Sequence, residues 1–153
     1  MNTRVHNPEV LFAVDEVRGF DDLDLAELAA RARANPSGVC RICLHRNEAD
    51  PVHEMLIAKR RDSVYPPHCH RATEESLIVI QGLAELLLFD GSGLVTRRLP
   101  LGGPGSGRTA FARIPALCYH DLRLESEMFI FLETKPGPFN PSDNQTAPFK
   151  APF

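Results

Sequence analysis

The chain has 153 residues, of which 43% are hydrophobic and 24% charged, with a formal charge of -3 and a pI near 6.1. This length and composition predict one compact domain, and the charge leaves no basic surplus for nucleic acid. No apolar run approaches the ~20 residues that cross a bilayer, and the chain start has no secretory pattern, so we expect a cytoplasmic protein with four reduced cysteines and no membrane partner.

The first predicted element is an amphipathic helix in the stretch "DDLDLAELAARARAN". Its apolar residues recur with the spacing of one helix face: Leu25, Leu28, Ala29 and Ala32. Asp24 and Glu27 have the spacing of a capping box, and Pro36 with Gly38 ends the helix. We therefore expect an N-terminal segment, residues 1–38, whose helix packs outside a β-domain formed by residues 39–153.

From Cys40 onward, short apolar runs alternate with turn-forming residues. These runs are "CRICLH", "VHEMLIAKR", "SLIVIQ", "AELLLFD", "LVTRRLPL", "TAFARIP", "HDLRLES" and "MFIFLETK". Eight strands at this spacing predict a mainly β fold, a small antiparallel sandwich or barrel with the helix outside it. The tail after Lys135, rich in proline and phenylalanine, is expected to lie extended without forming an element.

A metal-binding pattern stands in "PPHCHRATEESLIVIQG", residues 66–82. The two prolines exclude a helix interior, and in an extended chain His68 and His70 point to the same side while Cys69 points away. Glu75 begins the next strand after a turn, and we place it on a neighbouring strand. Two imidazoles and a carboxylate form an N,N,O set that suits divalent transition metals and leaves positions open. A polar turn entering a strand is the alternative.

The same stretch resembles the first motif of the cupin proteins, His-x-His, three or four residues, Glu, six residues, Gly. The matching residues are His68, His70, Glu75 and Gly82. The second cupin motif is matched less fully by "PALCYH", in which Leu117 takes the place of a glycine and His120 ends the motif.

More particularly, four segments in this order resemble the small WbuC-type cupin-fold metalloproteins: "RICLHRNEADPVHEMLIA", "YPPHCH", "LLLFDGSGLV" and "ETKPGPF". The resemblance covers roughly residues 23–149. It implies a cupin double-stranded β-helix, His120 as a fourth ligand, and one divalent ion per chain, with iron, manganese, nickel, cobalt and zinc all suited to three imidazoles and one carboxylate.

Other residues are candidates for the wall of a ligand pocket. Arg41 can hold a carboxylate or phosphate through its donor fork, or be an ordinary surface arginine. His45 is either a pocket residue or a structural histidine, and Cys118 either stands near the metal or packs as a small hydrophobe. Tyr65 is the remaining pocket candidate, and Tyr65, His45 and Tyr119 are the candidates for a catalytic acid or base beyond the metal ligands. Cys40 and Cys43 form a C-x-x-C without a second pair, so no metal or redox role is assigned to them.

Two classes of function follow from this reading. In the first, the ion is catalytic and the protein acts on a small polar metabolite such as a sugar, a nucleotide sugar or a hydroxy or keto acid. The class of reaction, whether isomerase, dioxygenase or sugar modification, stays open. In the second, the same site binds a small ligand without catalysis. The strand "MFIFLETK" and the tail offer apolar surface, so a homodimer is expected.

Overall fold

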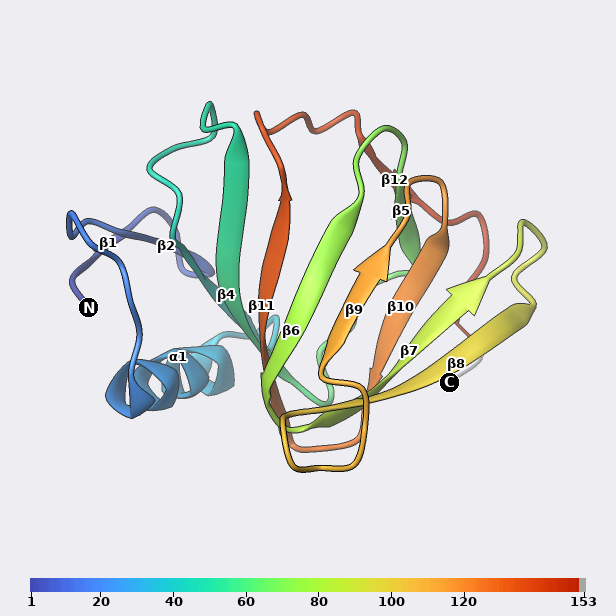
Figure 1. Cartoon of the computed structure of the whole chain (residues 1–153), viewed down its shortest axis with the longest axis horizontal. Helices are drawn as coiled ribbons and strands as arrows, with labels where there is room; N and C mark the ends of the chain where they lie inside the picture. Colours follow the sequence, from blue (N-terminus) through green and yellow to red (C-terminus); the bar gives the residue numbers. More distant parts are fainter. Residues whose placement is uncertain (152–153) are drawn as a thin grey trace.

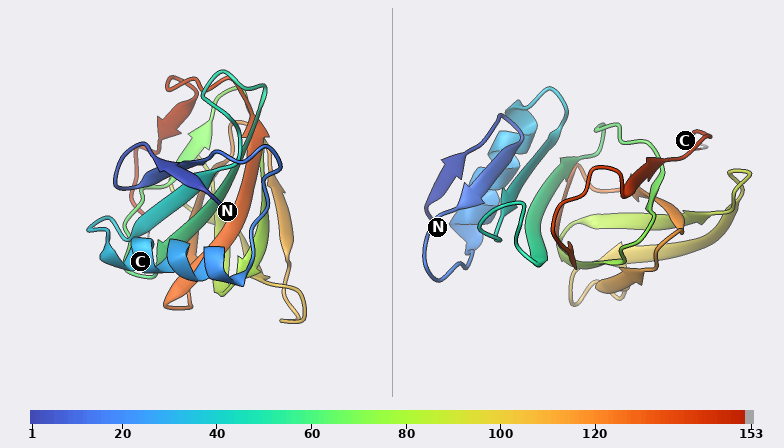
Figure 2. Two further views of the ribbon diagram at one scale, coloured as in Figure 1. Left: turned by 90° about the vertical axis from the view of Figure 1, so that its left-hand side faces the viewer. Right: turned by 90° about the horizontal axis from the view of Figure 1, so that it is seen from above.

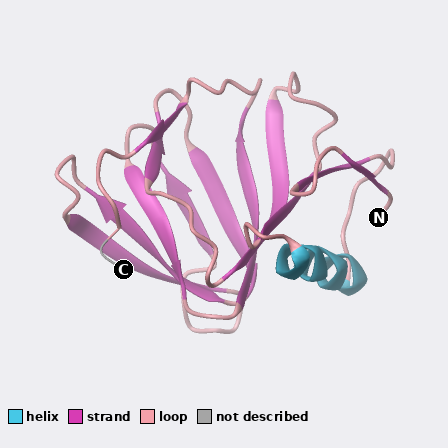
Figure 3. Ribbon diagram, turned by 180° about the vertical axis from the view of Figure 1, so that it is seen from behind, coloured by secondary structure: helices cyan, strands magenta, loops and turns pink. Residues whose placement is uncertain are grey.

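The computed structural model describes residues 1–151 and consists of two facing β-sheets with one α-helix on the outside (Figures 1 and 3). The first sheet has seven strands in the order β1 (Thr3–Val5), β2 (Val10–Ala13), β3 (Val39–Cys43), β4 (Val52–Arg60), β11 (Met128–Pro136), β6 (Glu75–Gln81) and β9 (Phe111–Ile114). The second sheet has five, in the order β12 (Asn144–Thr146), β5 (His68–His70), β10 (Tyr119–Leu124), β7 (Leu83–Phe89) and β8 (Val95–Gly102).

The helix α1 (Asp22–Ala34) lies where its apolar spacing predicted, against the outer face of the seven-stranded sheet (Figure 2). Leu28, Ala29 and Ala32 are buried against the sheet. The capping box was predicted one turn too late. The Asp21 side chain accepts from the backbone N–H groups of Leu23 and Asp24, because the helix begins at Asp22.

The central strands β3, β4 and β11 are apolar on both faces, which explains their nearly continuous hydrophobic runs. Even-numbered residues such as Cys40, Leu56 and Ile130 pack beneath the helix. Odd-numbered residues such as Cys43 and Phe129 point into the space between the sheets. Cys40 and Cys43 therefore lie on opposite faces, as expected for residues three apart in a strand, and all four cysteines are free.

All eight predicted strands are present, and four more are found in the described residues. The N-terminal segment contributes β1 and β2, and β2 pairs with β3 in parallel, so the fold is not wholly antiparallel. The tail also forms an element that was not expected, because β12 pairs with β5. The last two residues of the tail, 152–153, lie outside the described residues.

Strand β11 lies in the interior of the seven-stranded sheet, between β4 and β6. Its apolar residues, Met128 to Phe131, are buried within the single chain. The homodimer therefore stays a prediction that has lost the main surface on which it was based. Within residues 1–151 there is no helix long and apolar enough to span a membrane.

Candidate metal centre

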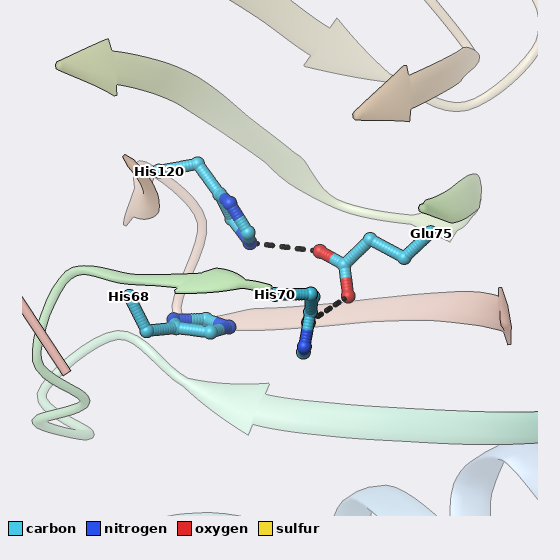
Figure 4. Close-up of side chains that lie close together, drawn as sticks. All are labelled: His68, His70, Glu75 and His120. Atoms are coloured by element: carbon cyan, nitrogen blue, oxygen red, sulfur yellow. Dashed lines mark hydrogen bonds and ion pairs between the residues drawn. The ribbon is translucent and has the colours of Figure 1, made fainter. Parts of the chain in front are cut away.

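Three histidines and one glutamate meet in the space between the sheets. His68 and His70 come from β5 and His120 from the adjacent β10, where His120 is the register partner of His68. Glu75 begins β6 in the opposite sheet, not on a strand next to β5 as expected from the sequence. The carboxylate therefore reaches the imidazoles across the interior (Figure 4).

The geometry of this group suits a single ion. One ligand atom from each residue lies within 4.8 Å of every other. Around an ion at about 2.1 Å from each ligand, neighbouring ligand atoms stand about 3 Å apart and opposite ones about 4 Å apart. Small rotations of the side chains suffice to place these atoms in one coordination shell.

The hydrogen bond at His120 fixes its ring in an orientation that favours a cation. Its Nδ1 lies 2.9 Å from the carbonyl oxygen of Cys118 and must donate there, so the proton of a neutral ring is on Nδ1. The lone pair of Nε2 then faces Glu75 Oε1 at 2.8 Å, and Nε2 has no hydrogen bond. Two electron-rich atoms this close require a proton or a metal ion between them.

The charges in the group follow the same logic. Burial, reinforced by the neighbouring His120, lowers the pKa of His68 to about 3, which keeps its imidazole neutral as a metal ligand requires. Burial alone would raise the pKa of the Glu75 carboxyl, but contacts with His120 and His70 outweigh it and hold that pKa well below its usual range. In the metal-free protein burial acts to lower the pKa of His120, but Glu75, the Cys118 carbonyl and Glu133 together outweigh it and raise that pKa.

Asp143, in the tail, lies close to His70, a neighbour that no sequence motif indicated. Its Oδ2 lies 3.6 Å from His70 Nδ1, while His70 Nε2 lies 2.9 Å from Glu75 Oε2. Asp143 also accepts hydrogen bonds from the Ala72 amide and the Thr73 hydroxyl, which fixes the turn between β5 and β6. A carboxylate behind a ligating histidine is a common means of fixing its orientation.

The turn before His120 has a residue in the left-handed backbone conformation that favours glycine, although this residue is a leucine. Leu117, which stands at the glycine position of the second cupin motif, has φ +63°. Its amide donates to the carbonyl of His70 at 2.7 Å, so this turn connects β10 to the strand that carries the histidine pair. A leucine in this conformation costs about 1–2 kcal/mol.

Replacing Leu117 with glycine should therefore be neutral or should increase the free energy of unfolding by up to about 1 kcal/mol, since the lost strain offsets the extra chain entropy. The control is Leu94→Gly, because Leu94 is as exposed as Leu117 and has no positive φ. That change should cost up to about 1 kcal/mol. Equal losses for the two variants in urea unfolding would contradict the assignment of strain to Leu117.

A cavity of about 320 Å³ adjoins the group and is lined by all four of its residues. Of the predicted pocket residues, Arg41 and Tyr65 line it, whereas His45 and Cys118 do not, and neither does Tyr119, a candidate acid or base. His45 instead stacks on His53, with ring centroids 4.0 Å apart, and His53 reaches the cavity. Cys118 packs against the apolar core.

Four charged residues of the cavity wall were missed in the sequence: Lys59, Asp121, Glu133 and Lys135. The sequence contained a pattern that could have indicated two of them, Glu133 and Lys135. Phe129, Phe131, Glu133 and Lys135 alternate along "MFIFLETK", so the strand face that begins in the core ends with charged groups in the cavity.

Glu133 is exposed to the cavity but surrounded by protein, and burial together with the nearby Glu75 raises its pKa to about 7. The carboxyl of Glu133 has an ordinary pKa of 4.5 in the unfolded chain. Between pH 4.5 and 7, the metal-free folded chain therefore keeps a proton that the unfolded chain has lost. Stability contributed by this group should thus fall as the pH rises from 4.5 to 7. Glu133→Gln should remove this loss, as measured by urea unfolding between those pH values, while the exposed Glu48→Gln should not. Parallel curves for Glu133→Gln and the unsubstituted protein would contradict the assignment.

Comparison with known proteins gives a family and a fold. The family model described as "Domain of unknown function (DUF6016)" matches residues 20–101. No curated protein matches the sequence.

Three solved structures illustrate the likeness in fold. A variant of Streptomyces PAC13 with uridine is 15% identical, with 78% of this chain and 89% of that chain covered and a TM-score of 0.57. Protein SO0799 from Shewanella oneidensis is 16% identical, with 73% and 75% covered and a TM-score of 0.57. The Lactobacillus farciminis oxalate decarboxylase formate complex is 19% identical, with 63% of this chain covered and a TM-score of 0.50; the chain spans only 27% of that enzyme. The two facing sheets and these likenesses show the cupin fold.

Proposed function

Since the chain belongs to the family described as "Domain of unknown function (DUF6016)" and has the cupin fold, we propose that it is a divalent-metal-dependent enzyme that acts on a small polar metabolite. The observation that carries this proposal is the convergence of three imidazoles and one carboxylate within 4.8 Å at the wall of a cavity. His68, His70, Glu75 and His120 would hold the ion.

An ion held there would polarise a carbonyl or hydroxyl of the ligand. Four protein ligands leave one or two positions of a five- or six-coordinate ion for that ligand. Ligands that chelate through two neighbouring oxygens suit such a site, which favours hydroxy acids, keto acids and sugars. Iron, manganese, nickel, cobalt and zinc all accept this donor set.

Glu133 favours an enzyme over a non-catalytic binding module. A module that only holds its ligand needs no group that transfers protons, whereas an enzyme of this kind does. Glu133 lines the cavity, is not one of the four metal-binding residues, and has a pKa raised by burial to about 7. At neutral pH it can therefore both accept and donate a proton.

Within the cupin superfamily, the likeness to the WbuC-type proteins supports placing the chain among them. Three of the segments that carry this likeness, residues 41–58, 65–70 and 133–139, contribute side chains to the same cavity. We also keep the cytoplasm as the proposed location and the homodimer as the proposed assembly.

The test is metal analysis of protein purified without a nickel column. We expect about one divalent ion per chain, followed by binding of hydroxy or keto acids that depends on this ion. Protein that binds none of the five metals, even after incubation with each, would contradict the proposal.

A further inference from the structure

The cavity beside the metal-binding residues is lined by charged side chains that do not form ion pairs with one another. Five charged side chains other than Glu75 line it: Arg41, Lys59, Asp121, Glu133 and Lys135. Among the residues that the structure describes, no cation of these five lies within 4.0 Å of a carboxylate oxygen of the other four. Only Arg41 has an ion pair, and its partner Glu9 is not part of the cavity wall. Enclosed charges without partners destabilise a fold, so they point to a ligand that completes them.

Lys59 shows this most clearly. It lies on the inner face of β4, and its ammonium stands 5.1 Å from the ring centroid of Tyr65 without a carboxylate in contact. Burial lowers its pKa and outweighs the nearby carboxylates of Asp121 and Glu133, which raise it, while the nearby Arg41 lowers it further. An anion brought into the cavity would relieve both effects.

Arg41 lies beside Lys59 with one donor unused. In the pairing of β3 with β4, Val39 stands opposite Lys59 and Arg41 opposite Ile57, so the two cations are diagonal neighbours on one face. Nη2 of Arg41 binds Glu9 at 2.9 Å, which anchors the guanidinium. Its Nε is buried and has no hydrogen-bond partner. Two cations therefore lie on neighbouring strands of the cavity wall, and within residues 1–151 neither Arg41 Nε nor Lys59 Nζ has a hydrogen-bond acceptor.

This part of the cavity wall is close enough to the metal-binding residues for one small molecule to reach both. The ring of Tyr65 lies 5.1 Å from the ring of His68, and Lys59 Nζ lies 5.1 Å from the ring of Tyr65. Because these two separations of 5.1 Å share the Tyr65 ring, the distance from Lys59 Nζ to the centroid of the His68 ring is at most about 10 Å. A chain of three or four carbons with an oxyanion at its end spans this gap.

We propose that the ligand of this cavity is a small acid with two anionic groups, one at the metal-binding end and a second, carboxylate or phosphate, bound between Lys59 and Arg41. This inference rests on the proposed function, because the first end needs the metal. The second oxyanion accepts from the Lys59 ammonium and from Arg41 Nε, and charge-assisted hydrogen bonds of this kind are the strong ones.

The experiment compares two matched pairs of acids on metal-loaded protein by calorimetry. Malate and lactate share an α-hydroxy acid end, and malate adds a carboxylate; 3-phosphoglycerate and glycerate share the same end, and the first adds a phosphate. In at least one pair, we expect the acid with the second anionic group to bind about tenfold or more tightly than its partner. The pair that shows the larger gain identifies the second group as carboxylate or phosphate.

Substitutions then assign the gain to its residues. Lys59→Met and Arg41→Met should each bring the ratio of the two affinities within a pair toward one while leaving the metal content unchanged. Arg97→Met is the control, because Arg97 is exposed on β8 and does not line the cavity. It removes the same charge and should leave the ratio unchanged.

Thermal unfolding of the ligand-free variants separates a binding role from a structural one. Lys59→Met removes an ammonium that has no ion-pair partner and keeps the aliphatic stem, so the midpoint should stay the same or rise. A clear fall in the midpoint would make Lys59 a structural residue and count against the inference. If Lys59→Met does not fold, the affinity ratios measured with Arg41→Met test the inference instead.

The outcomes distinguish this inference from the proposed function. Protein that takes up no metal overturns the proposed function. Metal-loaded protein that binds neither acid of either pair, or binds both acids of each pair equally, overturns the second anion site alone. So does a preference for the acid with the second anionic group that survives both substitutions.

Discussion

Replacing His120 with alanine should reduce the bound metal from about one ion per chain to well below one. His120 supplies an Nε2 whose lone pair is directed at Glu75 by the hydrogen bond from Nδ1 to Cys118. Removing even the groups behind a ligand commonly costs 10- to 100-fold in metal affinity, so the loss of a ligand should cost at least about 100-fold. Metal analysis after dialysis against a weak chelator measures this.

The matched control is His53→Ala. His53 is also a buried histidine at the cavity wall, but it stacks on His45 and is not one of the four converging residues. It should retain full metal occupancy. Circular dichroism should stay β-rich in both variants, because the cores on either side of the seven-stranded sheet are apolar. If His68→Ala and His120→Ala both retained full metal occupancy, the metal site would be wrong and the histidine pair would be part of a polar turn only.

Gly82→Ala should lower the free energy of unfolding by about 2 to 5 kcal/mol. Gly82 ends the first motif between β6 and β7 and has φ +89°, which penalises any side chain. A Cβ at this position would stand 2.5 Å from the carbonyl oxygen of Met128. Since that atom is backbone of the central strand β11, it cannot move aside without disturbing the sheet.

Gly91→Ala provides the comparison in urea unfolding. Gly91 is exposed, has no positive φ, and its Cβ would meet nothing within 4 Å. This change should be neutral or slightly stabilising, because alanine reduces the freedom of the unfolded chain. Similar small effects at both glycines would show that the motif glycine is not required by the backbone.

The sequence by itself determined the features that depend on residues close together in the chain. Helical spacing located α1, and alternation located eight strands, because these periods reflect the geometry of a single element. The same alternation placed His68 and His70 on one side of a strand. The resemblance to the cupin motif added His120, which no local pattern could have connected to the pair.

Only the tertiary structure decided which distant elements meet. It brought Glu75 to the histidines from the opposite sheet rather than from a neighbouring strand, and it placed Asp143 of the tail behind His70. It also set Lys59 beside Arg41 through the pairing of β3 with β4. Strand alternation says which side a residue faces but not which strand lies opposite, because pairing and packing are fixed by contacts across the whole chain.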